Sequence, residues 1–286
     1  MALNSTGERF LPELRGAIRW EHLHRYLFAR ELVAGRDVVD VASGEGYGSR
    51  LLAERARHVV GIDIAEEAVS HARRVYAKEG VLNFIKGDCT RLPLGDASVD
   101  AVVSFETIEH VDNPSRALGE FHRVLRPGGV LVVSSPNRAT YPKGNPFHRH
   151  EFSVEELRAE LGRLFKHVAL YGQRVVAGSC VLPLDGKQST EVGFWDDRDA
   201  GQGFNPGMTA PIYIIAVASN APLPATVAGC FDHADETRRL WHFFDQDYAE
   251  VCAELAAMKS SKSWQLTMPL RRFMRWASRR SANSSG

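Results

Sequence analysis

The sequence predicts an α/β fold, in which a doubly wound, mostly parallel sheet carries helices on both faces. From Val38 onward, short runs rich in β-branched residues alternate with stretches whose apolar residues recur at helical spacing. The short runs are apolar throughout rather than alternately apolar and polar, which is typical of strands buried on both faces. A hydrophobic content of 44% in 286 residues is sufficient for the large core that such a sheet requires.

The elements of this fold follow one another in regular order. A helix is expected across 16–33, before the sheet begins. Strands of the parallel sheet are expected at 37–42, 58–64, 81–88, 99–105 and 130–136. Helices between them are expected at 48–56, 66–80 and 114–129.

After Pro136 the alternation becomes less regular. Ser153 and Glu156 form a predicted capping box, so a helix is expected to begin there. Strands at 166–176 and 211–219 are expected to pair at the end of the same sheet, with 178–210 as a long loop between them and 220–229 as a linker. The predicted domains are an N-terminal helical lid (1–34), a ligand-binding domain (35–220), and a linker with a basic, amphipathic helical C-terminal extension (221–286).

Charge and cysteine patterns exclude several classes of partner. Lysine plus arginine and aspartate plus glutamate number 35 each, so no overall field draws the chain to nucleic acid. The four cysteines are scattered without a CxxC pair, which argues against a disulfide framework or a zinc site, and no metal is expected. The N-terminus lacks a signal-peptide pattern and no run approaches the ~18 apolar residues of a membrane span, so a cytoplasmic protein is expected.

The end of the chain carries concentrated positive charge. After Glu254 there is no acidic residue, and seven basic residues alternate with aromatic and aliphatic ones. Such a segment suits an anionic membrane face or a partner protein, and a solvated tail is the alternative. A peripheral contact with the inner membrane or with a protein through this basic helix therefore stays open, as does a homodimer.

A glycine-rich loop at 38–49, "VVDVASGEGYGS", follows the first predicted strand, where doubly wound folds bind ligands. A P-loop is excluded because no lysine follows these glycines. The dinucleotide fingerprint GxGxxG fits neither register, since its third glycine falls on Ser49 or on Leu51. S-Adenosyl-L-methionine needs close backbone contact but no phosphate contact, and Gly44 and Gly46 can supply that contact without a Cβ clash.

Two acids downstream suit the adenosine end of such a ligand. Asp63 ends the second strand, 19 residues past Gly44, where a carboxylate can accept hydrogen bonds from ribose hydroxyls. This spacing alone does not exclude NAD, which uses an acid in the same place. Asp88 follows the third strand and can accept a hydrogen bond from the adenine amino group.

Five segments in order resemble the class I S-adenosylmethionine-dependent methyltransferases, particularly the type 11 group. They are "VVDVASGEGYGS", "VVGIDIAEEAV", "IKGDCTRLPL", "VDAVVSFETIEHV" and "RVLRPGGVLVVSSPN", and the resemblance covers about residues 35–220. One departure is Ala42, where the family usually has glycine. The resemblance implies a Rossmann-like sheet of seven strands with the last strand antiparallel.

The resemblance also implies roles for single residues around the cofactor. Asp40 would help to position the methionine amino group, and Asp63 would hold the ribose. Asp88 and Cys89 would flank the adenine, and Phe105 and Glu106 would line the methyl-donor pocket. The full expected cofactor set is Asp40, Ala42, Gly44, Gly46, Asp63, Ile64, Asp88, Cys89, Phe105 and Glu106.

Three histidines are the candidates for catalysis on the acceptor, because imidazole is a suitable general base near neutral pH. His110 follows the fourth strand, and His148 and His150 lie after the fifth. The alternative is that His110 caps a helix while the other two hold a loop in place. Arg25 and Tyr26 on the N-terminal helix are candidates for contact with substrate or cofactor as part of a lid.

The class of methyl acceptor is predicted from shorter sequence resemblances. The N-terminal stretch, the loop "ASGEGYGS" and the tail segment "SKSWQLTMPLRRF" resemble methyltransferases of bacterial surface-polysaccharide biosynthesis, which implies O-methylation of a sugar or glycan-linked acceptor. A small phenol, quinone precursor or natural product is the second alternative, and a non-catalytic scaffold subunit is the third. The sequence "SFETIEH" stands where a nucleic-acid base methyltransferase usually has an NPPY-like motif, which counts against nucleic acid as acceptor.

Overall fold

The computed structural model describes residues 17–142, 144–175, 178–184, 193–194, 205–206, 208, 210–226 and 229–232. All of them belong to one compact unit that ends at Asp232. The predicted basic extension beyond this point lies outside the described residues. In the part of the chain that is described, no helix is long and apolar enough to cross a membrane.

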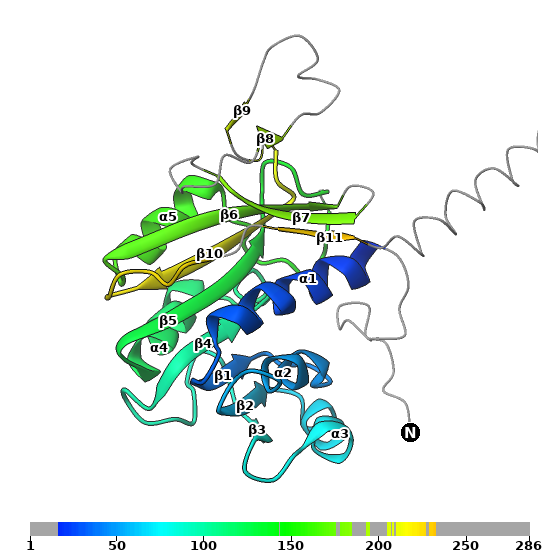
Figure 1. The fold of residues 1–286 in the computed structure, drawn as a ribbon, viewed down its shortest axis with the longest axis vertical. Helices are drawn as coiled ribbons and strands as arrows, with labels where there is room; N and C mark the ends of the chain where they lie inside the picture. The colour runs from blue at the N-terminus through cyan, green and yellow to red at the C-terminus, as the bar shows by residue number, and fades with distance from the viewer. Residues whose placement is uncertain are drawn as a thin grey trace, which may run out of the picture. The chain divides into compact units, whose positions relative to one another are not determined.

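One mixed sheet organises the described chain (Figure 1). Its first five strands in space are parallel, in the order β3 (Leu82–Lys86), β2 (His58–Asp63), β1 (Asp37–Val41), β4 (Val99–Ser104) and β5 (Leu125–Pro136). Strand β10 (Tyr213–Ser219) is antiparallel and inserts between β5 and β6 (His167–Val175). These seven strands confirm the predicted Rossmann-like sheet with its last strand reversed.

Two further strands extend the sheet beyond β6, and they correct the predicted loop and linker. Strand β7 (Gly178–Pro183) pairs antiparallel with β6, although 178–210 was predicted to be a loop. Strand β11 (Gly229–Asp232) pairs with β7 at the far end of the predicted linker. Both strands are short and form by pairing at the edge of the sheet, which local sequence does not reveal. A separate small ribbon joins β8 (Gly193–Phe194) and β9 (Asn205–Pro206).

Helices cover both faces of the sheet, as the uniformly apolar strands predicted. Val38 packs in a cluster with residues of α1 (Ala17–Leu32), α2 (Tyr47–Leu52) and α3 (Glu66–Tyr76). Its neighbour Val39 points the other way, into a cluster with α4 (Pro114–Val124) and α5 (Val154–Gly162). Figure 1 shows α4 and α5 on the opposite side of the sheet from α1 and α2. Because side chains alternate along a strand, both faces of β1 are core.

Local signals define where the helices begin. The predicted capping box at α5 is present: the Ser153 hydroxyl accepts from the Glu156 amide at 3.2 Å, and the Ser153 amide donates to the Glu156 carboxylate at 2.9 Å. At α4, Asn113 accepts from the Arg116 amide, and Pro114 occupies the first turn, where its missing N–H costs nothing.

Candidate active site

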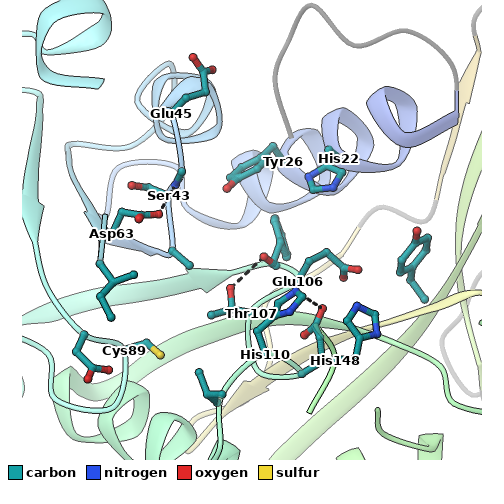
Figure 2. A pocket seen from close by; sticks show the side chains of 18 of the residues that line it. His22, Tyr26, Ser43, Glu45, Asp63, Cys89, Glu106, Thr107, His110 and His148 are labelled. Atoms are coloured by element: carbon teal, nitrogen blue, oxygen red, sulfur yellow. Dashed lines mark hydrogen bonds and ion pairs between the residues drawn. The ribbon is translucent and has the colours of Figure 1, made fainter. Parts of the chain in front are cut away.

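A cavity of about 510 Å³ opens at the carboxyl ends of the parallel strands (Figure 2). Its walls come from the loops after β1, β2, β3 and β4, from α1, and from the segment between Tyr141 and His148. The volume falls within the ~300–1,000 Å³ usual for small-molecule sites, and the position is where doubly wound sheets bind ligands.

The loop after β1 forms one wall through two residues in left-handed backbone conformations. Gly44 has a φ of 57°, and its amide donates to Asp63 Oδ2 at 2.8 Å. Ala42 has a φ of 61°, a conformation that costs a residue with a Cβ about 1–2 kcal/mol more than glycine. A glycine at position 42 would adopt this backbone geometry without that cost. Both residues line the cavity, as expected.

Gly46 and Gly48 serve packing instead of ligand contact. Gly46, expected to touch the cofactor, is outside the cavity lining; a Cβ on it would lie 2.9 Å from the Phe84 ring. A Cβ on Gly48 would lie 2.0 Å from Tyr26 Cζ, so the absent side chain makes room for the Tyr26 ring. The glycines of this loop therefore have two different roles: Gly44 lines the cavity, whereas Gly46 and Gly48 allow close packing in the core.

Backbone amides hold the Asp63 side chain in the wall of the cavity. Its Oδ2 accepts from Gly44 and its Oδ1 accepts from Ala65 at 2.9 Å. These two bonds fix the orientation of the carboxylate in the cavity wall. The adjacent Ile64 side chain is 66% exposed and lines the same cavity, where it offers an apolar surface to a ligand.

Asp88 and Cys89 line the wall after β3, as expected. Asp88 Oδ1 accepts from both the amide and the hydroxyl of Thr90, at 2.7 and 2.8 Å, which fixes the carboxylate. Burial raises the pKa of the Cys89 thiol to about 11, so the thiol is neutral near pH 7 and offers an uncharged surface.

Asp40 lies beneath the loop and does not line the cavity. Its carboxylate accepts from the Ser49 hydroxyl at 2.6 Å and from the Tyr26 hydroxyl at 3.2 Å. Burial is the main cause that raises the pKa of Asp40 to about 7. The expected contact with a ligand amino group is therefore indirect in this structure: Asp40 ties α1 and α2 together below the cavity.

Phe105 and Glu106 line the cavity after β4, and Arg25 supports Glu106 from behind. Glu106 has a φ of 51°, and Ser134 both accepts from its amide and donates to its Oε1. The fully buried Arg25 guanidinium lies 3.4 Å from Glu106 Oε1 and 4.5 Å from the centre of the Tyr213 ring. Arg25 is thus a positioning residue for Glu106, and it does not line the cavity itself.

Tyr26, the other expected lid residue, does line the cavity. Its ring makes edge contacts with Tyr47 and Phe105, at centroid distances of 5.4 and 5.0 Å. Helix α1 therefore contributes a fixed wall through this side chain in the structure.

His110 and His148 meet at the other end of the cavity from Asp63 and Cys89 (Figure 2). Their ring centres are 5.0 Å apart. The Nδ1 atom of His148 lies 2.7 Å from Glu151 Oε1, and that of His110 lies 3.3 Å from the Phe147 carbonyl. Glu109 joins them with a fully buried carboxylate, and burial raises the pKa of this group well above its usual range.

His150, the third candidate, is placed elsewhere. It lines a neighbouring hollow with Ser115 and Arg149, and the centres of its ring and the Phe152 ring are 4.5 Å apart. The chain turns after His148, so that two histidines only two residues apart serve different surfaces. The structure therefore brings together two of the three predicted histidines.

Several lining residues were not anticipated from the sequence. Glu109 stands in "FETIEHV" between two residues that were singled out, so its position directly after a strand could have indicated it. No local signal marks Tyr141, Asn145 and Tyr213, which long-range packing brings to the cavity, whereas His22 on the N-terminal helix and Glu45 in the glycine-rich loop lie in segments that the sequence singled out.

The cavity is acidic. Five carboxylates line it, and no lysine or arginine does among the residues that the structure describes. Such a wall favours a cationic ligand over a phosphate or carboxylate. The five are Glu45, Asp63, Asp88, Glu106 and Glu109.

Comparison with known proteins assigns this architecture. Residues 39–133, which span the loop after β1 through β5, match the family model described as a methyltransferase domain. The match identifies a methyltransferase domain in this part of the chain, in line with the resemblance of its motifs to S-adenosylmethionine-dependent methyltransferases. A structure of such a methyltransferase from Archaeoglobus fulgidus has a TM-score of 0.53 and 18% identity, covers 72% of this chain and 96% of that one, and agrees in fold.

Relatives in sequence carry the same domain. A probable S-adenosylmethionine-dependent methyltransferase of Mycolicibacterium smegmatis is 44% identical over 54% of this chain and 62% of its own length. A similarly named protein of Mycobacterium tuberculosis is 41% identical over 56% of this chain and 60% of its own. A demethylmenaquinone methyltransferase of Clavibacter sepedonicus is 39% identical over 35% of this chain and 41% of its own length. The chain matches about three fifths of the length of the first two.

The residues present fit S-adenosylmethionine, the cofactor of this methyltransferase domain. The ligand carries a sulfonium and an ammonium group, which suit a wall that contains carboxylates and, among the described residues, no lysine or arginine. The fixed Asp63 carboxylate and the exposed Ile64 side chain offer the acceptor and the apolar surface that a nucleoside requires. Among the described residues, the lining contains no lysine or arginine that could pair with a pyrophosphate.

Proposed function

We propose that the whole protein is an S-adenosylmethionine-dependent O-methyltransferase that acts on a sugar or glycan-linked hydroxyl. The observation that carries the proposal is that one cavity joins two different halves. One half, around Gly44, Asp63 and Asp88, fits the methyl donor. The other half presents the imidazoles of His110 and His148 beside buried carboxylates.

The polar character of the histidine half favours a hydroxylated acceptor. Tyr141, Asn145 and Tyr213 add hydroxyl and amide groups to the two imidazoles there. The hydroxyls of a polyhydroxylated ring can donate to and accept from such groups, whereas an apolar quinone offers few hydrogen-bonding atoms. The demethylmenaquinone methyltransferase relative nevertheless makes a quinone the second class of acceptor to assay.

Acidity sets a further limit on the acceptor. A hydroxyl next to a phosphate or carboxylate would bring negative charge into a cavity whose described lining contains carboxylates and no lysine or arginine to pair with it. The reacting part of the acceptor is therefore uncharged or cationic. Nucleotide sugars fit only if their phosphates stay outside this end of the cavity.

The chain's own residues supply alignment and proton transfer. When bound, S-adenosylmethionine would supply a sulfonium-activated methyl group for transfer to the acceptor oxygen, with the electron pair of the carbon–sulfur bond returning to sulfur. Arg25 and Ser134 hold Glu106 near the reacting centre, and alignment of this kind can supply ~7–11 kcal/mol. The imidazoles of His110 and His148 are anchored by their hydrogen bonds at this end of the cavity, where one of them can accept the proton of the acceptor hydroxyl.

The test is transfer of a labelled methyl group into panels of neutral glycans, nucleotide sugars and quinones. Neutral glycans are expected to accept the label, and His148→Ala is expected to lower the rate by ~10²–10⁴-fold. His58→Ala, an exposed histidine at the amino end of β2, is the control and should leave the rate unchanged. Transfer to quinones alone, or a His148→Ala rate equal to that of the wild type, would contradict the proposal.

A further inference from the structure

Three potential ligands for a metal ion converge at the histidine end of the cavity. One nitrogen each from His110 and His148 and one oxygen from Glu109 all lie within 4.8 Å of one another. Glu109 Oε1 is 3.9 Å from His110 Nε2. Around a zinc-sized ion, with bonds of about 2.0–2.2 Å, such atoms lie roughly 3.4 Å apart, so adjustments of about 1 Å would close the set.

Each imidazole is anchored on its far side in the way that metal-binding histidines are. His148 Nδ1 lies 2.7 Å from Glu151 Oε1, a carboxylate–histidine pair. His110 Nδ1 lies 3.3 Å from the Phe147 carbonyl oxygen. When Nδ1 donates to these acceptors, the lone pair is on Nε2, which is the form that binds a cation. Asn145 Nδ2, 2.8 Å from His148 Nε2, has to rotate away when the ion binds.

The Glu109 carboxylate is the independent observation that points to a ligand. The residue is fully buried, lines the cavity, and neither of its side-chain oxygens has a hydrogen-bond partner among the described residues. A buried carboxylate without partners is costly, and such groups in proteins are paired or coordinate a metal. Arg25, the nearby buried cation, is directed to Glu106 instead.

We propose that Glu109, His110 and His148 bind one divalent transition-metal ion. The spacing of the cysteines could not indicate this site, because its ligands are two imidazoles and a carboxylate. Two nitrogens and one oxygen leave coordination positions open, as in catalytic zinc sites and in two-histidine, one-carboxylate iron sites. The inference rests on the proposed function for its role: an ion here would bind the acceptor oxygen and lower the pKa of its hydroxyl.

The ligand set selects the class of ion. Imidazole suits Zn²⁺, Fe²⁺, Co²⁺ and Ni²⁺, whereas Ca²⁺ and Mg²⁺ prefer oxygen ligands alone. Co²⁺ is therefore a suitable probe, since it takes the same ligands and absorbs visible light when bound.

The experiment titrates metal-stripped full-length protein with Co²⁺, followed by visible absorption, and titrates the same samples with S-adenosylmethionine by calorimetry. One Co²⁺ per chain is expected. Loss of an outer partner of a metal ligand lowers metal affinity by ~10–100-fold, and Glu151→Gln should lower the affinity for Co²⁺ within that range. A larger loss of Co²⁺ affinity is expected for each variant of a direct ligand: Glu109→Gln, His110→Ala and His148→Ala. His58→Ala is the control for adventitious binding to a surface histidine.

The two titrations separate the failure of this inference from that of the proposed function. Co²⁺ that fails to bind wild-type protein, or binds all variants equally, overturns the metal site, whatever the cofactor titration gives. Co²⁺ that binds as expected to protein without affinity for S-adenosylmethionine supports the metal site and contradicts the proposed function. Retained cofactor binding in the variants shows that they are folded.

Discussion

At the scale of single residues, the fully buried Asp40 carboxyl group beneath the cavity has a raised pKa. Among the described residues, the donors to the buried Asp40 carboxylate are the hydroxyl groups of Tyr26 and Ser49, and the Asp63 carboxylate is close enough to raise its pKa further. Hydroxyl donors stabilise the ionised form less than a cation would, so burial decides the outcome and the neutral form is favoured. Stability at this position should therefore depend on pH.

The Asp40→Asn variant tests this dependence. The pKa of Asp40 is raised from 3.8 to about 7 on folding, so its protonated form contributes stability below about pH 4 that is lost as the pH rises through 7. The full difference corresponds to roughly 4 kcal/mol. Between pH 4 and 8, the wild-type free energy of unfolding should fall relative to that of Asp40→Asn, measured by urea denaturation at each pH.

The difference between the two proteins isolates Asp40, because the other buried acids with raised pKa values, Glu21 and Glu109, are present in both. Parallel pH profiles for the two proteins would show that Asp40 ionises as easily in the fold as in the unfolded chain.

At the scale of elements, the contact between α1 and α2 depends on missing side-chain atoms. The Tyr26 ring of α1 occupies the space above Gly48 in α2, and its hydroxyl reaches Asp40 in β1. One residue thereby joins three elements under the loop that carries Gly44. Glycine within a helix is normally a weakness, and here it permits the close approach.

Gly48→Ala is therefore expected to destabilise the protein by about 1–3 kcal/mol, because its Cβ would overlap the Tyr26 ring. Gly119→Ala is the matched control within α4, where a Cβ meets nothing within 4 Å, and it should stabilise by about 0.4–1 kcal/mol. Urea denaturation measures both. Equal stabilisation by the two substitutions would show that helix propensity, and not the Tyr26 contact, determines the effect at Gly48.

At the scale of the whole molecule, parallel strands explain which parts of the site the sequence could predict. The carboxyl ends of β1, β2, β3 and β4 meet at one edge, so residues directly after these strands gather in one cavity. Eight of the ten expected cofactor residues line it, and their roles toward the cofactor stay predictions. The eight are Ala42, Gly44, Asp63, Ile64, Asp88, Cys89, Phe105 and Glu106.

The remaining parts depend on packing over long sequence distances. Tyr213 reaches the cavity only because β10 inserts between β5 and β6. Gly46 and Asp40 follow the expected motif, yet core contacts with Phe84 and Tyr26 draw them away from the cavity. Strand β7 was missed for a related reason, since its hydrogen-bond partners belong to β6 and β11 rather than to its own segment.

The central claim is that this cavity binds S-adenosylmethionine through the Asp63 side, and calorimetric titration of the cofactor tests it most directly. Wild-type protein should bind, and Asp63→Asn should bind roughly 10- to 100-fold more weakly, because hydrogen bonds to a charged group contribute about 1.5–3 kcal/mol. His58→Ala, at the other end of the same strand, should bind like the wild type. No binding by the wild type, or equal affinity in Asp63→Asn, would contradict the account.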